Sequence, residues 1–144
     1  MSTLDEMDSK ILGLLLKDGR MSFTNIAEKL RVNEATVRKR ISALRRDGVI
    51  KRFTVVVDHA KLGMNTVAIV GIEADPTKLL DIAQKLCDLK ELKCVATSSG
   101  DHMIMAEVWT KNGKELTKLM SEKIGKIEGV ERICPALILE KLKE

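Results

Sequence analysis

A helix-length segment in the first third of the chain combines cationic and small side chains in a pattern suited to DNA. The segment runs from Glu34 to Asp47. At 100° per residue, its outer face carries Ala35, Lys39, Ser42 and Arg46, with Thr36, Arg38 and Ala43 on the shoulders. Small residues let a helix approach the base edges closely, and the cations complement phosphate charge. The pattern therefore predicts a helix that enters the major groove of duplex DNA.

Two kinds of contact are expected from this face and its neighbours. Arg38 and Lys39 can donate hydrogen bonds to guanine. Ala35 or Thr36 can touch a thymine methyl group. The expected phosphate contacts come from the remaining cations and from two residues at helix starts, namely Arg40, Arg45, Arg46, Ser22 and Asn33. The alternative is that residues 38–40 are an ordinary solvated helix surface, as charge runs usually are.

Three short helices are expected to position this face. Apolar residues between Asp5 and Leu16 fit one side of a first helix. Ser22 is a good N-cap for a second helix, and Asn33 for a third that closes at Gly48. The three-residue turn at 31–33 has the spacing of a helix-turn-helix. The inner face of the third helix is apolar and should pack on the other two; it comprises Val37, Ile41 and Leu44.

A strand should follow the helices as the wing of a winged helix-turn-helix. Residues 49–57 are rich in β-branched side chains. Lys51 and Arg52 in this strand would lie beside the DNA backbone, or would protect an edge strand from aggregation. We therefore divide the chain into a winged helix-turn-helix domain at residues 1–57, a hinge at 58–64 and a second domain at 65–144.

The second domain has the order β-α-β-β-α-β, which is typical of a ferredoxin-like fold and makes the chain an α+β protein. Strands are expected at 66–73, 93–98, 102–109 and 131–140. Helices are expected after Asp75-Pro76 and from about Gly113 to Ile127. Pro135 cannot donate to a neighbouring strand, so the last strand should lie at an edge or be bulged there.

Positive charge is concentrated in the first domain. Residues 1–57 carry 12 Lys or Arg against 7 Asp or Glu, whereas residues 58–144 carry 13 against 14. This asymmetry indicates a polyanion-binding module joined to a neutral one. Aromatic residues form only 2% of the chain, which argues against the stacking platforms of single-strand binders.

Residues for catalysis or metal binding do not form recognisable motifs. Cys87, Cys94 and Cys134 lack C-x-x-C spacing, so we expect buried thiols rather than disulfides or metal ligands. No P-loop or Ser-His-Asp set is present, and neither a catalytic residue nor a cofactor is expected. The absence of a leader and of a span of roughly 18 apolar residues predicts a cytoplasmic protein without membrane association.

Short motifs along nearly the whole chain form a specific combined pattern. In the first half they are Leu4-Asp5-x-x-Asp8-x-x-Ile11-Leu12, Lys17-Asp18-Gly19-Arg20, the helix at 35–41 and Leu44-x-x-x-Gly48-Val49-Ile50. In the second half they are Ser99-Gly100-Asp101 and Glu128-Gly129-Val130. The sequence thereby resembles the Lrp/AsnC family of transcription regulators, also called feast/famine regulators. The resemblance implies a winged helix-turn-helix joined by a hinge to a ligand-sensing βαββαβ domain, often called RAM.

The resemblance also implies partners. Members bind palindromic sites in double-stranded promoter DNA, dimerise through the sheets of the second domain and often assemble into tetramers or octamers. Many respond to an amino acid held between dimers near a glycine-aspartate turn. The matching effector-binding residues in this chain are Thr97, Ser98, Ser99, Gly100 and Asp101. Amides and hydroxyls there can receive a carboxylate or an ammonium group, while the alternative is a tight hairpin that needs glycine.

Two positions depart from the family pattern. Arg31 stands where glycine is usual, so a non-glycine residue is expected at positive φ, at a cost of roughly 1 kcal/mol. Met103 stands where amino-acid-sensing members commonly carry an aspartate, which removes a carboxylate that can hold an α-amino group. Effector binding at this turn and a tight hairpin that needs glycine therefore stand as the two alternatives.

Two other function classes compete. Sirohaem decarboxylases resemble this two-part architecture, but their reaction needs a basic porphyrin cleft and proton donors, and the only histidines are His59 and His102. The second class is an adaptor that uses its helix-turn-helix for protein contacts. Acidic residues on the outer face of the third helix would favour an adaptor, but that face is cationic in this chain. We therefore expect a sequence-specific DNA-binding transcription regulator and not an enzyme.

Overall fold

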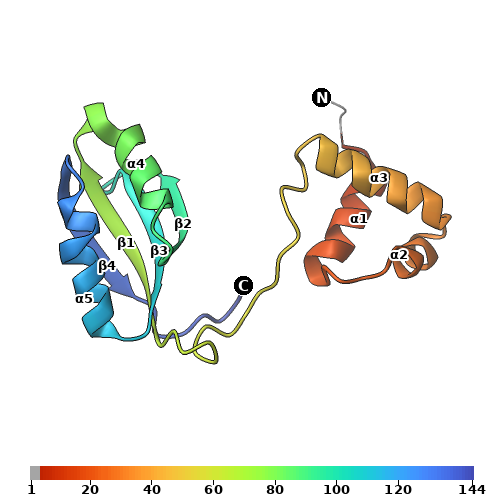
Figure 1. Ribbon diagram of the computed structural model, residues 1–144. Coiled ribbons are helices and arrows are strands. Elements are labelled where there is room, and N and C mark those ends of the chain that lie inside the picture. Colours follow the sequence, from red (N-terminus) through yellow and green to blue (C-terminus); the bar gives the residue numbers. More distant parts are fainter. Residues whose placement is uncertain (1–3) are drawn as a thin grey trace. The chain divides into compact units, whose positions relative to one another are not determined.

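The computed structural model describes residues 4–144. Its contacts divide the chain after Val56 into two units, residues 1–56 and 57–144. Figure 1 shows the first as a group of helices and the second as a sheet with helices beside it. Within the described residues, no helix has the length and apolar character needed to cross a membrane.

Local capping signals set the starts of the helices α1 (Glu6–Lys17), α2 (Phe23–Leu30) and α3 (Glu34–Arg46). Asp5 accepts a hydrogen bond from the Asp8 amide at 2.8 Å, while the Asp8 side chain accepts from the Asp5 amide. Ser22 and Asn33 cap α2 and α3 in the same way, as predicted. Each cap satisfies an amide that the first helical turn leaves unpaired, so these starts need no distant partner.

The core of the first unit is where the three helices meet. Its buried members are apolar residues from all three helices, namely Ile11, Ile26, Ala27, Val37 and Ile41. The i, i+4 spacing of Val37 and Ile41 faces α3 toward α1 and α2, as predicted. The opposite side of α3 is therefore left to solvent.

The expected strand over residues 49–57 is not formed, so this prediction is wrong for the single chain. Residues 51–58 have no regular secondary structure, and Val55 and Val56 are 71% and 72% exposed. A strand needs a partner to pair its backbone groups, and none of the strands in the described residues pairs with this segment. β-Propensity alone does not provide that partner. Lys51 and Arg52 consequently lie on an exposed, irregular segment.

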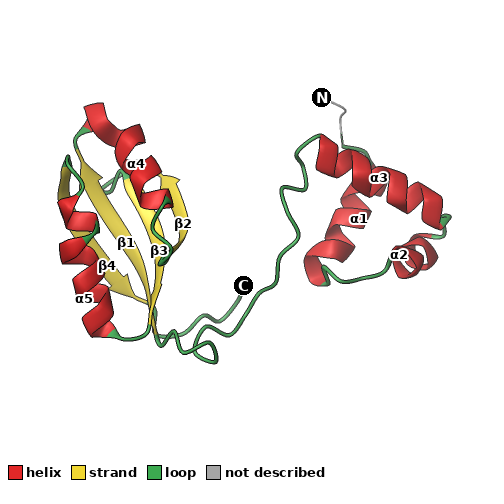
Figure 2. Cartoon of the chain, viewed as in Figure 1, coloured by secondary structure: helices red, strands yellow, loops and turns green. Residues whose placement is uncertain are grey.

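The second unit is a four-stranded antiparallel sheet with the strand order β2-β3-β1-β4 (Figure 2). Its strands are β1 (Thr66–Ala74), β2 (Leu92–Thr97), β3 (Ile104–Thr110) and β4 (Val130–Leu137). The helices are α4 (Leu79–Cys87) and α5 (Gly113–Glu122), with short 3₁₀ turns η1 (Pro76–Lys78) and η2 (Ile124–Lys126). This order confirms the predicted ferredoxin-like fold, and β4, which carries Pro135, lies at an edge as expected.

Both helices of the second unit pack on one face of its sheet. Alternate residues of β1 point into this core, including Val70 and Ile72, where they meet Ile82 of α4 and Leu116 of α5. The other face of the sheet, here called the open face, receives the alternating residues of each strand and is covered by neither helix. Its central positions are Ile69, Gly71 and Glu73 on β1 and Met105, Glu107 and Trp109 on β3.

The helix predicted to reach Ile127 ends at Glu122 and passes into η2. The break depends on Gly125, since a Cβ there would lie 2.8 Å from the Met120 carbonyl oxygen. The expectation of buried thiols is also wrong. Cys87 and Cys94 are exposed and Cys134 is half-buried. Cys94 and Cys134 lie on the two edge strands, β2 and β4, where they pair with the open-face residues Glu107 and Gly71.

Candidate nucleic-acid interface

The buried side of α3 determines which residues it presents outward. Val37 is fully buried, and Ile41 and Leu44 are nearly so, which orients the helix about its axis. The residues opposite them, here called the α3 outer face, are all exposed: Ala35, Lys39, Ser42 and Arg46. The structure thus brings together the face that helical periodicity predicted.

Arg31 joins α2 to α3 in the left-handed conformation, with φ 56° and ψ 45°. It is the one non-glycine residue at positive φ among residues 4–144, and the prediction made for this position is confirmed. The turn is stabilised by a hydrogen bond from the Val32 amide to the Ala27 carbonyl at 3.0 Å. This bond helps to offset a backbone cost of roughly 1 kcal/mol, so an exposed cation stands beside the start of α3.

The two cap residues keep only part of their hydrogen-bonding capacity for a ligand. The Ser22 hydroxyl accepts from the Asn25 amide, which leaves its own proton to donate. The Asn33 side-chain oxygen accepts from both the amide and the hydroxyl of Thr36, at 2.7 and 2.8 Å, which leaves the NH₂ group of Asn33 to donate. Because the Thr36 hydroxyl is engaged in this way, its methyl group is what it can offer to a base.

Arg38 links the two helices of the helix-turn-helix. Its guanidinium is 2.6 Å from Glu34 and 5.0 Å from the centre of the Phe23 ring. Glu34 also accepts from Thr24 of α2 at 3.0 Å, and the hydrogen bonds from Thr24 and Arg38 lower the pKa of this carboxyl. Exposed i, i+4 pairs of this kind are weak, so Arg38 can exchange Glu34 for a base or a phosphate.

Arg40, which was expected to contact phosphate, is paired in the single chain with two carboxylates at the start of the first helix. Its guanidinium is 2.6 Å from Asp5 and 2.9 Å from Asp8, at the start of α1, and about a third of its side chain is exposed. These partners raise the pKa of Arg40. Residue 40 lies on the flank of α3 that turns toward α1, which is why these two carboxylates reach its guanidinium. We infer that Arg40 holds α1 against α3.

Replacing Arg40 by glutamine should change the titration of Asp5 in a defined way. The pKa of Asp5 is lowered first by its hydrogen bond from the Asp8 amide and second by the one from Arg40. In Arg40→Gln, carboxyl NMR should show that this pKa rises but stays below its ordinary value of 3.8, because the amide bond survives. A lowered folded pKa stabilises the fold above the ordinary value, and this contribution is lost as the pH falls through the folded pKa.

The internal control for this measurement is Asp75 of the second unit. Its pKa is lowered by hydrogen bonds from the Thr77 hydroxyl and amide, so it should titrate unchanged in the Arg40→Gln variant. An Asp5 titration that is also unchanged would show that the ion pair with Arg40 does not form in solution.

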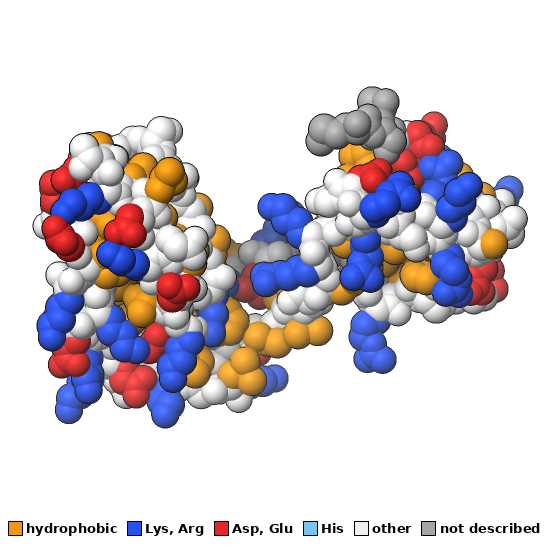
Figure 3. Space-filling view, turned by 45° about the horizontal axis from the view of Figure 1, so that its top comes forward, with side chains coloured by type: hydrophobic (Ala, Val, Ile, Leu, Met, Phe, Trp, Pro, Cys, Tyr) orange, Lys and Arg blue, Asp and Glu red, His pale blue; other side chains and the backbone are white. Residues whose placement is uncertain are grey.

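The remaining predicted phosphate contacts lie at or beyond the end of α3. The Arg45 guanidinium is 5.8 Å from the centre of the Phe53 ring, and Arg46 is 3.1 Å from Asp47. Lys51 and Arg52 are exposed and form no ion pair with any described residue. On the face shown in Figure 3, Lys and Arg predominate over the helical unit, whereas both signs of charge are interspersed over the other unit.

The predicted effector residues lie together where β2 meets β3: Thr97 is the last residue of β2, and Ser98 to Asp101 belong to the exposed turn that follows. Gly100 adopts φ 108°, which favours glycine, and the Ser98 amide donates to the Met103 carbonyl at 2.9 Å. All five residues are exposed in the single chain. The alternative of a tight turn that needs glycine therefore accounts for Gly100 without a ligand.

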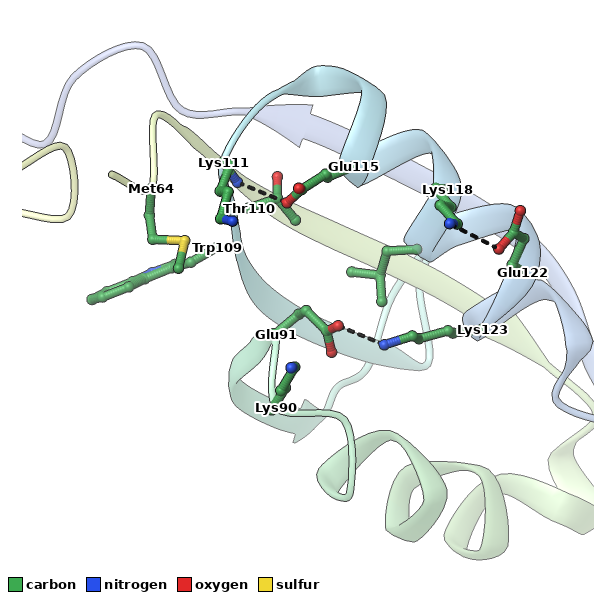
Figure 4. Close-up of a pocket in the computed structure, with 11 residues that line it drawn as sticks. Met64, Lys90, Glu91, Trp109, Thr110, Lys111, Glu115, Lys118, Glu122 and Lys123 are labelled. Atoms are coloured by element: carbon green, nitrogen blue, oxygen red, sulfur yellow. Dashed lines mark hydrogen bonds and ion pairs between the residues drawn. The ribbon is translucent and has the colours of Figure 1, made fainter. Parts of the chain in front are cut away.

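A cavity of about 420 Å³, which the sequence did not reveal, lies between α5, β3 and the loop before β2 (Figure 4). Its lining is rich in lysine, with Lys90, Lys111, Lys118 and Lys123. Glu91 is partly desolvated there, but its 2.6 Å hydrogen bond from Lys123 lowers its pKa overall. Because the lysines are spread over more than thirty positions, no local motif signals the cavity.

Comparison with known proteins gives a match over both units. Residues 4–51 match the family model described as winged helix-turn-helix DNA-binding, and residues 67–144 match the Lrp/AsnC ligand binding domain. The transcriptional regulator LrpA of Pyrococcus horikoshii is 47% identical over 140 residues, covering 97% of this chain and 99% of its own.

Two solved structures share the fold. Escherichia coli AsnC aligns with a TM-score of 0.87 at 20% identity, covering 99% of this chain and 97% of its own. A Neisseria meningitidis transcriptional regulator, solved as a complex with L-methionine, aligns with a TM-score of 0.90 at 16% identity, covering 99% and 94%. The matched families and these relatives are transcription regulators, not enzymes.

Proposed function

Because the chain belongs to the Lrp/AsnC family of DNA-binding transcription regulators, we propose that the α3 outer face reads promoter DNA in the major groove. The observation that carries this proposal is the division of α3 into two sides. One side is buried in the core of the first unit, while the other is exposed and combines small residues with cations. A helix held in this way can enter the groove without losing its own packing.

Base contacts come from residues 35–39 of α3, and phosphate contacts from its C-terminal half, from the helix starts and from the segment after it. Lys39 is exposed and has no ion pair with any described residue, so it can donate to guanine without breaking an internal contact. Arg38 reads a second base after leaving Glu34, and Ala35 and Thr36 approach thymine methyl groups. The phosphate contacts are Ser22, Asn33, Ser42, Arg45, Arg46, Lys51 and Arg52. Arg40 is left out, because Asp5 and Asp8 hold it.

The Lys39→Ala variant tests this assignment. It should weaken binding to a selected operator by about 1–3 kcal/mol, and relax the preference at one base pair, because a base contact is lost. The measurement is a fluorescence-anisotropy titration of the operator and of its single-base variants, at several salt concentrations. Lys114→Ala, which removes an equal charge from an exposed site on α5, is the matched control.

The salt dependence separates base reading from phosphate binding. Log affinity of the unmodified protein should fall linearly with log salt concentration, since phosphate contacts release counterions. If Lys39→Ala lowers affinity equally for every sequence, Lys39 contacts phosphate instead. A flat salt response, or no sequence preference in a genome-wide selection, would refute the proposed interface.

The second unit is the part we propose for oligomerisation and sensing. Family members form oligomers, and the open face offers the half-buried side chains of Ile69, Met105 and Trp109 to a second copy. An amino-acid effector would bind at the turn 97–101, completed by another copy, or in the lysine-lined cavity of Figure 4. The L-methionine complex of the Neisseria regulator supports an amino acid as the class of effector. Because Met103 replaces the aspartate of amino-acid-sensing members, this chain would have to hold the α-amino group with another residue.

We also propose the working divisions of the chain and its compartment. Residues 1–57 bind DNA, 58–64 act as a hinge, and 65–144 carry assembly and sensing. The division is supported by the break in contacts after Val56 and by the limits of the two matched families. A regulator that contacts promoter DNA works where that DNA is, and we place it in the cytoplasm.

A further inference from the structure

Three side chains with metal-ligating groups meet on the open face of the sheet. They are Glu73 of β1, His102 of the turn before β3 and Cys134 of β4. One carboxylate oxygen, one imidazole nitrogen and the thiol sulfur all lie within 4.8 Å of one another. All three residues are half-buried, so the cluster is not a set of mobile surface side chains.

Sheet register brings these residues together. Gly71 of β1 is paired with Cys134 of β4, and Glu73 follows Gly71 on the same face of the strand. The His102 ring lies directly over Gly71, where a Cβ would be only 2.3 Å from the ring. Any larger residue at position 71 would displace the imidazole. The His102 ring thus packs directly on the backbone of Gly71, in the space that a side chain there would fill.

The His102 imidazole has an unmet hydrogen-bonding group in this position. Its Nδ1 is buried and has no hydrogen-bond partner. The nearest carboxylate oxygen, on Glu73, is 3.7 Å away, which is too long for a hydrogen bond. A buried polar atom without a partner is unfavourable, and a cation placed between the nitrogen and the carboxylate would satisfy both.

We propose that Glu73, His102 and Cys134 hold a borderline-soft divalent transition metal of the Zn²⁺ class. Thiolate, imidazole and carboxylate are the ligands this class prefers, whereas Mg²⁺ and Ca²⁺ prefer oxygen alone. Metal–ligand bonds of about 2.0–2.3 Å would require the three side chains to converge slightly. Three protein ligands leave one position for water or for a group from a second copy of the chain. The proposal does not depend on how α3 reads DNA.

Arg132 is the group that competes with the metal. Its guanidinium is 3.5 Å from the Glu73 carboxylate, but 69% of its side chain is exposed in the single chain, so it can turn away from Glu73. A bound cation and Arg132 repel each other and share one carboxylate. Removing Arg132 should therefore strengthen metal binding, whereas removing a ligand should weaken it.

Titration of the reduced full-length protein with Co²⁺, followed by displacement with Zn²⁺, tests the site. A thiolate-to-cobalt charge-transfer band is expected, which a thiol-free site does not give. Glu73→Gln and His102→Gln should each weaken Co²⁺ binding by at least about tenfold, and Arg132→Gln should strengthen it. The double variant Cys87→Ser/Cys94→Ser, which leaves Cys134 as the one thiol, should keep the band.

Each outcome decides for or against the site. Retention of the band in the double variant, together with its loss in Cys134→Ser, supports the proposal. Absence of the band in the unmodified protein, or its loss in the double variant, overturns it. Should Cys134→Ser fail to fold, the double variant and Arg132→Gln still give the answer, because neither alters a proposed ligand.

Discussion

Replacing Ala35 by glutamate is expected to abolish specific DNA binding while leaving the fold intact. Ala35 is exposed in the first turn of α3, at the centre of the proposed contact with the major groove. A carboxylate there would meet the negatively charged DNA, and its length would hold α3 off the base edges. Like-charge contacts at an interface cost several kcal/mol, so affinity should fall by at least about 100-fold.

The same substitution should not destabilise the helix, because an acidic side chain in the first turn is favoured by the helix dipole. Thermal unfolding should therefore be unchanged or slightly raised, which separates loss of binding from loss of folding. Gln84→Glu, which changes the net charge equally at an exposed position on α4, is the control and should bind as the unmodified protein does. Tight binding by Ala35→Glu would exclude α3 from the groove.

Truncation of Ile72 to alanine should produce a large loss of stability in the second unit. Ile72 is fully buried in the central strand β1, where it pairs with Ile104 on one side and Ile133 on the other. Removing a buried side chain of this size loses its transfer free energy and leaves a cavity, which together cost about 2–5 kcal/mol. Urea unfolding can be followed by the fluorescence of Trp109, the single tryptophan and a residue of this unit.

Leu80→Ala is the matched control for this experiment. Leu80 lies on α4 but is 79% exposed, so its truncation should change the free energy of unfolding by no more than about 0.5 kcal/mol. Equal losses for the two variants would mean that α4 and the sheet do not pack as described.

Features that depend on neighbours in sequence were predictable for this chain. The caps at Ser22 and Asn33 each rest on a side chain and an amide three residues away. The inner face of α3 follows from helical periodicity, whereas the left-handed conformation of Arg31 was expected from the family resemblance, in which glycine is usual at this position. The order of strands and helices in the second unit was predictable for the same reason, because each element carries its own periodicity.

Features that depend on partners far away in the sequence were not predictable. Residues 49–57 have strand propensity, but the single chain supplies no strand to pair with them. Arg40 lies in the run of three cations at residues 38–40, yet its partners are Asp5 and Asp8 at the start of α1, more than thirty residues earlier. The half-buried cluster of Glu73, His102 and Cys134 combines residues from three separate elements, so no spacing in the sequence could indicate it.

The helix-turn-helix, the cationic outer face and the ferredoxin-like order could all be derived from the residues alone, because they follow from contacts within a few residues and from hydrophobic periodicity. The folded chain was needed to show which cations of α3 have internal partners, since Arg40 is paired with Asp5 and Asp8 while Lys39 has no ion pair with a described residue. It also placed His102 over Gly71, because strand register, which no short segment encodes, brings β1, β3 and β4 into contact.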